Sequence, residues 1–185
     1  MTDFTIHTID TAPERARAGL SAAQQKLGFI PNMMAVLAES PVALEGYQAV
    51  QGALATSSLS TAEQHFLALA ISVDNGCTYC VPAYSMMAAK SGTPQQAVDA
   101  VRDGKPIDDG RLSALRDFTR AVVEKRGRAE EEVKAFLAAG FTKAQVLEVI
   151  LAVALKLISN YTNQVADIPL DEAFQAYRWD GQKAA

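Results

Sequence analysis

Hydrophobic residues in this 185-residue chain recur at the three- and four-residue spacing of helices, in segments separated by glycine, proline and serine. One such segment has an apolar stripe on one face and charged residues on the other. Its apolar members are Leu112, Leu115, Phe118 and Val122. No alternating β-branched run bounded by hairpin turns occurs, so the pattern predicts an all-α fold.

Capping residues mark where several of these helices should begin. Ser40, followed by proline, predicts a helix start, and Ser60 with Glu63 three residues later forms a capping box. Thr142 is expected to cap a long apolar helix that continues through 146–158. The sequence therefore predicts several short helices and one long one.

Two of the predicted helices, 59–74 and 142–158, are apolar on most sides. Such a helix is buried or packs against another subunit. We therefore expect an oligomer, the alternative being that one of the two is the central helix of a monomeric bundle. The apolar stretch in the second helix is interrupted by Glu148 and Lys156 and is short for a bilayer, so we expect no membrane association.

The composition is that of an ordinary globular protein, with 49% hydrophobic and 21% charged residues. This length suits a single domain. The net charge of −4 and the lack of a Lys/Arg cluster argue against a nucleic-acid partner. The N-terminus shows no signal-peptide pattern, and we expect a cytoplasmic protein.

The only two cysteines, Cys77 and Cys80, form a C-x-x-C motif. This motif is typical of thiol–disulfide chemistry or of metal binding. A zinc ion normally has four ligands, and the chain adds only His7 and His65, so zinc would have to be shared between subunits. A redox-active dithiol is the leading interpretation, with no bound metal or cofactor expected.

The cysteines should lie where a helix begins. Unpaired backbone N–H groups at a helix N-terminus favour a thiolate, and this argument favours Cys77 as the attacking sulfur. At 100° per residue, Tyr84 lies about 20° and Cys80 about 60° from Cys77. We expect these side chains to form one patch bordered by Met87, in which Tyr84 either hydrogen-bonds a thiolate or is a residue at the core edge.

The segments 59–66 and 70–85 resemble the carboxymuconolactone decarboxylase superfamily, and within it the AhpD-like, peroxidase-related branch. Segments 157–163 and 169–174 are similar to that branch as well. The resemblance implies an AhpD-like helical bundle over 29–185, preceded by an arm and helix at 1–28. It implies a homotrimer or homohexamer that reduces small hydroperoxides and is itself reduced by a lipoyl- or thioredoxin-like dithiol partner.

The chain departs from the family pattern at two positions of the proton relay. His65 stands where the family has a glutamate, and Tyr84 stands where it has a histidine. An imidazole titrates near neutrality, so His65 could act as the base, whereas Glu63 is on another side of the helix. The resemblance assigns peroxide attack to Cys80 and resolution to Cys77. The candidate site is therefore Cys77, Cys80, His65 and Tyr84.

Two alternatives remain open. One is a thiol–disulfide redox protein or sensor without peroxidase activity, and the other is a non-catalytic oligomeric binding protein of the same fold. Decarboxylation is less favoured, because the decarboxylases of the superfamily generally lack the cysteine pair. We assign no catalytic role to Asn160 or Asn163, and we expect His7 to lie on the surface.

Overall fold

The computed structural model describes residues 4–181. All regular elements in this range are helical, with no strand, which confirms the predicted all-α class. The elements are α1 (Glu14–Leu27), α2 (Asn32–Leu37), α3 (Pro41–Ala55), α4 (Thr61–Asp74), α5 (Cys80–Lys90), α6 (Gln95–Arg102), α7 (Gly110–Glu124), α8 (Glu130–Ala138), α9 (Lys143–Ala166) and the 3₁₀ helix η1 (Glu172–Tyr177).

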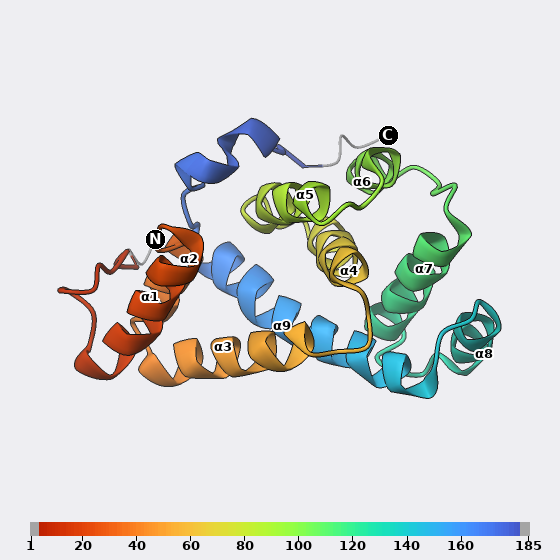
Figure 1. The fold of residues 1–185 in the computed structure, drawn as a ribbon, viewed down its shortest axis with the longest axis horizontal. Helices are drawn as coiled ribbons and strands as arrows, with labels where there is room; N and C mark the ends of the chain where they lie inside the picture. Colours follow the sequence, from red (N-terminus) through yellow and green to blue (C-terminus); the bar gives the residue numbers. More distant parts are fainter. Residues whose placement is uncertain (1–3, 182–185) are drawn as a thin grey trace.

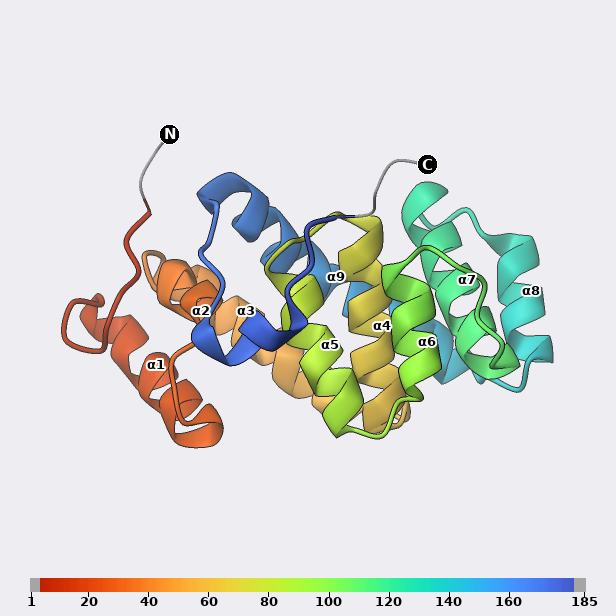
Figure 2. The same ribbon diagram turned by 90° about the horizontal axis from the view of Figure 1, so that it is seen from above.

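The helices form an elongated bundle around α9 (Figure 1). Helices α1 and α2 lie at one end and α7 and α8 at the other, while α4 and α5 occupy the middle. Seen from above, η1 lies beside α5 (Figure 2), and the two elements are in contact. The middle of the molecule is therefore where segments from both halves of the chain meet.

The predicted capping residues are confirmed. Ser40 accepts a hydrogen bond from the Ala43 amide, and Ser60 and Thr142 each form a complete capping box. The long helix capped by Thr142 continues to Ala166, beyond its predicted end at Ile158. Local capping chemistry thus fixed the helix start, but the sequence pattern misplaced the helix end.

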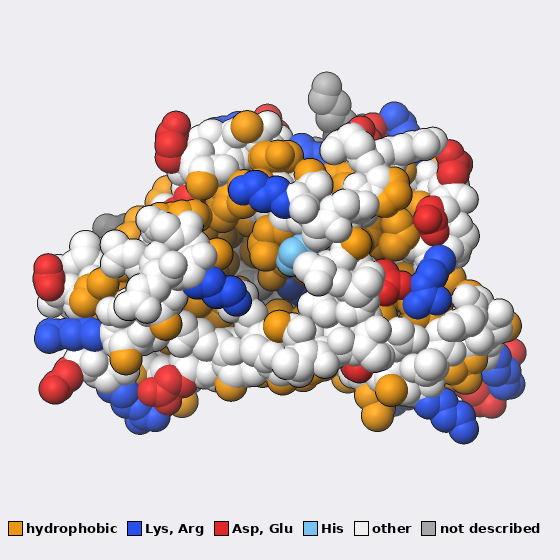
Figure 3. Space-filling view, viewed as in Figure 1, with side chains coloured by type: hydrophobic (Ala, Val, Ile, Leu, Met, Phe, Trp, Pro, Cys, Tyr) orange, Lys and Arg blue, Asp and Glu red, His pale blue; other side chains and the backbone are white. Residues whose placement is uncertain are grey.

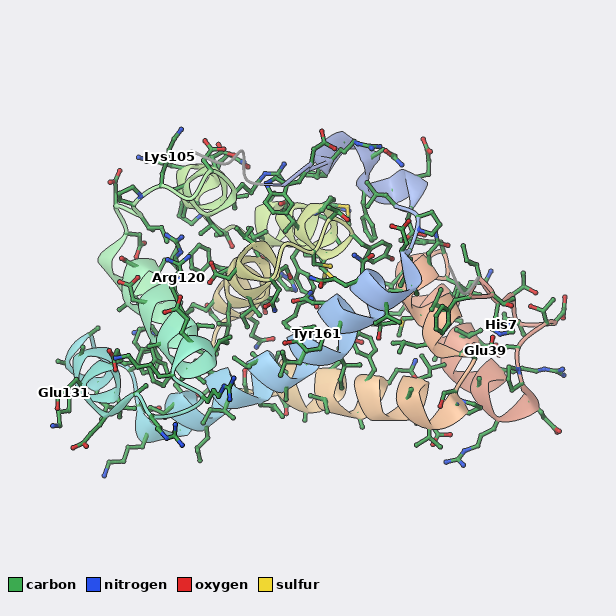
Figure 4. The ribbon with its side chains drawn as sticks, turned by 180° about the vertical axis from the view of Figure 1, so that it is seen from behind. His7, Glu39, Lys105, Arg120, Glu131 and Tyr161 are labelled. Carbon is green, nitrogen blue, oxygen red and sulfur yellow. The ribbon has the colours of Figure 1, made fainter. Side chains whose placement is uncertain are left out.

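Helix α9 is long and apolar enough to cross a membrane by length and composition alone, unlike the shorter stretch predicted for it. In this structure it packs against α2, α3, α4, α7 and α8, as the core helix of a folded domain does. Its outer face is nevertheless apolar and exposed. In the view from behind, Tyr161 lies on this face (Figure 4); its other large exposed side chains are Leu147, Ile150 and Val165.

The turn between α4 and α5 places the cysteines in the interior. Helix α4 is buried from Phe66 to Val73 and packs closely on α5. Gly76 has φ = +63°, a left-handed conformation that glycine adopts without strain. The chain then turns back, and the Cys77 amide donates a 2.9 Å hydrogen bond to the Ser72 carbonyl.

The C-terminal segment packs over the cysteine turn. The Tyr79 hydroxyl donates a 2.5 Å hydrogen bond to the Asp171 carboxylate, which also accepts from the Asn32 amide. The Phe174 ring lies edge-on to Tyr79, with ring centroids 5.9 Å apart. Tyr79, between the two cysteines in the sequence, therefore anchors η1 to α5.

Candidate active site

The two thiols lie next to each other at the start of α5, and both are free. The Cys80 amide donates a hydrogen bond to the Cys77 sulfur over 3.1 Å, and the Val81 amide donates to the Cys77 carbonyl over 3.0 Å. Cys77 thus precedes the helix, and its sulfur and its carbonyl accept hydrogen bonds from the first turn of α5. The prediction that a helix begins at the cysteines is confirmed, because α5 begins at Cys80.

The surroundings of the pair favour ionisation of Cys80. Burial of this thiol would raise its pKa, but hydrogen bonds from Cys77, Asn160 and Ser159 and the charge of Lys156 lower the pKa to about 6. The hydrogen bond to Cys80 raises the pKa of Cys77 far above that of a free thiol, and burial adds to the effect. Cys80 is therefore the thiolate and Cys77 the thiol that donates to it.

A polar face of α9 forms one wall of this site. Lys156 is fully buried, and its Nζ lies 3.9 Å from the centre of the Tyr84 ring. Asn160 is also fully buried, accepts a 2.9 Å hydrogen bond from Asn75 and donates to the Ser72 hydroxyl. The sequence analysis assigned no catalytic role to Asn160, and the structure places this side chain beside Cys80.

The sequence held one signal for this wall. Lys156, Ser159, Asn160 and Asn163 recur at helical spacing within a strongly apolar helix, and all four are buried. Buried polar groups need partners. A polar stripe on the inner face of an apolar helix indicates a site in the core.

Two tyrosines close the site on the side of α3 and α5. Tyr84 shares a hydrogen bond with the side chain of Tyr47, a buried residue of α3. Burial raises the pKa of both phenols well above the ordinary tyrosine value. Both therefore stay neutral near pH 7 and are suited to donate hydrogen bonds, not to accept a proton as bases. Tyr47 was not among the predicted site residues.

His65 lies near Tyr84, with ring centroids 6.4 Å apart. Burial lowers its pKa, and a hydrogen bond with the Met87 backbone offsets part of that effect. Its Nδ1 is buried and has no partner among the described residues. Glu63 forms a 2.6 Å ion pair with Arg111 in addition to its capping bond, so this carboxylate is engaged away from the thiols, as expected.

The two thiols are shielded from solvent. Figure 3 shows one face of the molecule, with a hollow in its middle that is lined mainly by hydrophobic side chains. Cys77 is fully buried, and Cys80 is 3% exposed. Within residues 4–181, no group of three or more His, Cys, Asp or Glu side chains could hold a metal ion. Neither sulfur is thus open to bulk solvent in this structure.

His7 is distant from the dithiol in the sequence, and its side chain hydrogen-bonds none of the described residues around the two thiols. It hydrogen-bonds the exposed carboxylate of Glu39 over 2.9 Å, near the start of the described chain. In the view from behind, the two labelled side chains lie together at the end of the molecule formed by α1 and α2 (Figure 4). His7 therefore belongs to a contact between the N-terminal arm and the end of α2.

Comparison with solved structures gives the same fold over nearly the whole chain. An alkylhydroperoxidase AhpD core, a peroxidase-related protein from Ralstonia eutropha JMP134, is 23% identical with a TM-score of 0.83, covering 92% of this chain and 93% of that one. A peroxidase-related protein from Silicibacter sp. TM1040 is 18% identical with a TM-score of 0.79, covering 95% and 94%. A debrominase is 19% identical with a TM-score of 0.79, covering 96% of each chain.

Sequence comparison matches part of the chain to a known family. A search of curated proteins returns no match. Residues 41–121 match the Carboxymuconolactone decarboxylase family, a segment that runs from the start of α3 into α7 and includes both cysteines. The match over 41–121 and the shared fold agree with the resemblance found in the sequence: residues 41–121 match the carboxymuconolactone decarboxylase family, and the chain has the AhpD-like fold.

Proposed function

We propose that this protein reduces small hydroperoxides with the Cys77–Cys80 dithiol and is re-reduced by an external dithiol. The observation that carries the proposal is the pairing of a stabilised thiolate with a neighbouring thiol. Cys80 is held ionised while Cys77 stays protonated and in contact with it. A thiolate is the nucleophile in peroxide reduction, and a second thiol is needed to resolve the product.

In the first step, the Cys80 thiolate attacks one oxygen of the hydroperoxide. The S–O bond forms, the O–O bond breaks, and the alcohol leaves after taking a proton. In the second step, Cys77 attacks the sulfur of the Cys80 sulfenic acid, the S–S bond forms, and water leaves. The external dithiol then returns two electrons and two protons by thiol–disulfide exchange. A reducing cytoplasm would supply such a dithiol.

The test is peroxide consumption with cumene hydroperoxide, coupled to oxidation of dihydrolipoamide. We expect turnover by the wild type and none by Cys80→Ser. Cys77→Ser should react once and stop at a sulfenic acid, because it lacks the resolving thiol. Mass spectrometry of the wild type after one equivalent of peroxide should show a loss of two hydrogens per chain. A stable sulfinic acid without a disulfide would contradict the dithiol cycle.

A second candidate is thiol-dependent removal of bromide from an aromatic substrate. The observation that favours it is the aromatic enclosure of the dithiol by Tyr47 and Tyr84. A cysteine-to-alanine variant of the debrominase mentioned above has been solved in complex with 2,3,4-tribromopyrrole. In this chain, the same two thiols would supply the two electrons that replace a C–Br bond with C–H, and they would end as a disulfide. Bromide release from tribromopyrrole, measured beside peroxide consumption, separates the two candidates.

A further inference from the structure

Lys156 is the most unusual charged residue in the described part of the chain. Its side chain is fully buried, and its Nζ has no hydrogen-bond partner among the described residues. The Tyr84 ring below Nζ offers a cation–π contact, which is worth up to about 2 kcal/mol when desolvated. The effective penalty for burying an ion is several kcal/mol. The ring alone therefore does not offset the burial of this ammonium.

A negative charge near Lys156 would supply the missing stabilisation. No Asp or Glu forms an ion pair with Lys156 within residues 4–181, where every such pair involves other cations. The group that can carry this charge is the Cys80 sulfur. Cys80 lies one helical turn before Tyr84 on α5, Nζ of Lys156 lies over the Tyr84 ring, and Lys156 acts electrostatically on the sulfur. Several titratable side chains face Cys80. They are Cys77 and Tyr79 on the turn before α5, Tyr84 on α5, Tyr47 on α3 and Lys156 on α9.

We propose that Lys156 is the counter-ion of the Cys80 thiolate. Lys156 is then a positioning residue: it acts on the substrate only through Cys80. This proposal deepens the proposed function. Only the expected effect of Lys156 on turnover rests on that function. The ionisation of Cys80 is a property of the resting protein and can be measured without any substrate.

The same contact has a consequence for the disulfide. When Cys80 joins Cys77 in a disulfide, the thiolate charge disappears and the Lys156 ammonium is left buried without its counter-ion. A cation that stabilises the reduced form and not the oxidised form raises the reduction potential of the pair. Lys156 therefore favours re-reduction of the protein as well as ionisation of Cys80.

The experiment compares Lys156→Met with Lys156→Arg, and Lys143→Met serves as the matched control. Lys143 is exposed in the first turn of the same helix, about 20 Å along its axis from Lys156, so its loss removes the same charge away from the thiols. The readout is the ultraviolet absorbance of the thiolate as a function of pH in the reduced protein, with Cys80→Ser as the blank.

The wild type and Lys143→Met should titrate near pH 6. Lys156→Met should titrate at least one pH unit higher, a loss of about tenfold or more in the thiolate-to-thiol ratio. Lys156→Arg should restore most of the ionisation. Lys156→Met removes a buried ammonium and also weakens the stabilising ionisation of Cys80, two opposing effects on the melting temperature, so the titration of Cys80 is the deciding readout.

A Lys156 that serves only the fold would give the opposite pattern. Lys156→Met would then lose stability and keep its Cys80 titration unchanged, and that unchanged titration would overturn the proposal. If the methionine variant does not fold, Lys156→Gln gives the same comparison with a polar, uncharged side chain. Absence of peroxide turnover in the wild type would refute the proposed function but not the assignment of Lys156, because the titration contains no peroxide.

Discussion

The stability of the reduced protein should rise with pH across the neutral range because of one thiol. Cys80 has a pKa of about 6 in the folded chain against 9.0 for an unperturbed thiol. Between these values the unfolded chain binds a proton at Cys80 that the folded chain has released. Stability rises with pH wherever the unfolded state binds more protons. The contribution of Cys80 to the free energy of unfolding is therefore fully present above pH 9 and is lost as the pH falls through 6.

The size of the effect follows from these two pKa values. The full difference corresponds to about 4 kcal/mol. Applying the linkage relation from pH 6 to pH 8 gives a gain of about 2 kcal/mol from Cys80 alone. Cys77 does not counteract this gain, because its raised pKa leaves it protonated in both states until the pH approaches 9. Its opposing contribution begins only at higher pH.

The assay is urea unfolding of the wild type and of Cys80→Ser between pH 5.5 and 8.5 in the presence of a phosphine reductant. Other groups, including His65 with its lowered pKa, titrate in both proteins and cancel in the difference. The difference in unfolding free energy should grow by about 2 kcal/mol from pH 6 to pH 8. A difference that stays constant across this range would refute the assignment of a stabilised thiolate to Cys80.

Four further outcomes test other parts of the structure. Light scattering at micromolar concentration should give a mass of three or six chains, and Ile150→Lys on the exposed face of α9 should reduce that mass; a monomeric wild type would contradict this. His65→Ala should slow peroxide reduction by less than the 10²–10⁴-fold typical of a lost general base, because the imidazole is not bonded to either sulfur. Tyr84→His, which restores the family residue, should raise the rate if the present residue limits proton transfer, and an unchanged rate would show that it does not. Tyr79→Phe should cost about 1–3 kcal/mol in urea unfolding, because it leaves the Asp171 carboxylate short of a donor.

The parts of the fold that the sequence predicted correctly are those decided by near neighbours. The capping boxes at Ser60 and Thr142 involve residues three apart, and the contact between Cys77 and Cys80 does so as well. The predicted helix start at the cysteines is correct as well, because α5 begins at Cys80.

The parts that the sequence did not reveal depend on contacts between distant helices. Lys156 was interpreted as an interruption of an apolar stretch, and its partner, the ring of Tyr84, lies on another helix. The polar residues after Ile158 suggested the end of the helix, although Ser159 and Asn160 are buried beside Cys80. A polar residue on an apolar helix is ambiguous until the packing of that helix is known, since it can equally mark solvent or a buried site.

The absence of the carboxylate–imidazole pair that the resemblance implies does not by itself remove the means to ionise a cysteine. A relay takes the proton from a thiol at the moment of reaction, whereas a buried cation keeps the thiolate ionised before the substrate arrives. With Cys80 already ionised, no base is needed, and the remaining requirement is an acid for the departing oxygen.

Cys77 is protonated and in contact with Cys80. If Cys77 gives its proton to the leaving alkoxide, it becomes the thiolate that attacks the Cys80 sulfenic acid, so one proton transfer would serve both steps. On this reasoning the rate of peroxide reduction should rise with the ionisation of Cys80 near pH 6 and then stay level through neutral pH, and it should not depend on the titration of an imidazole.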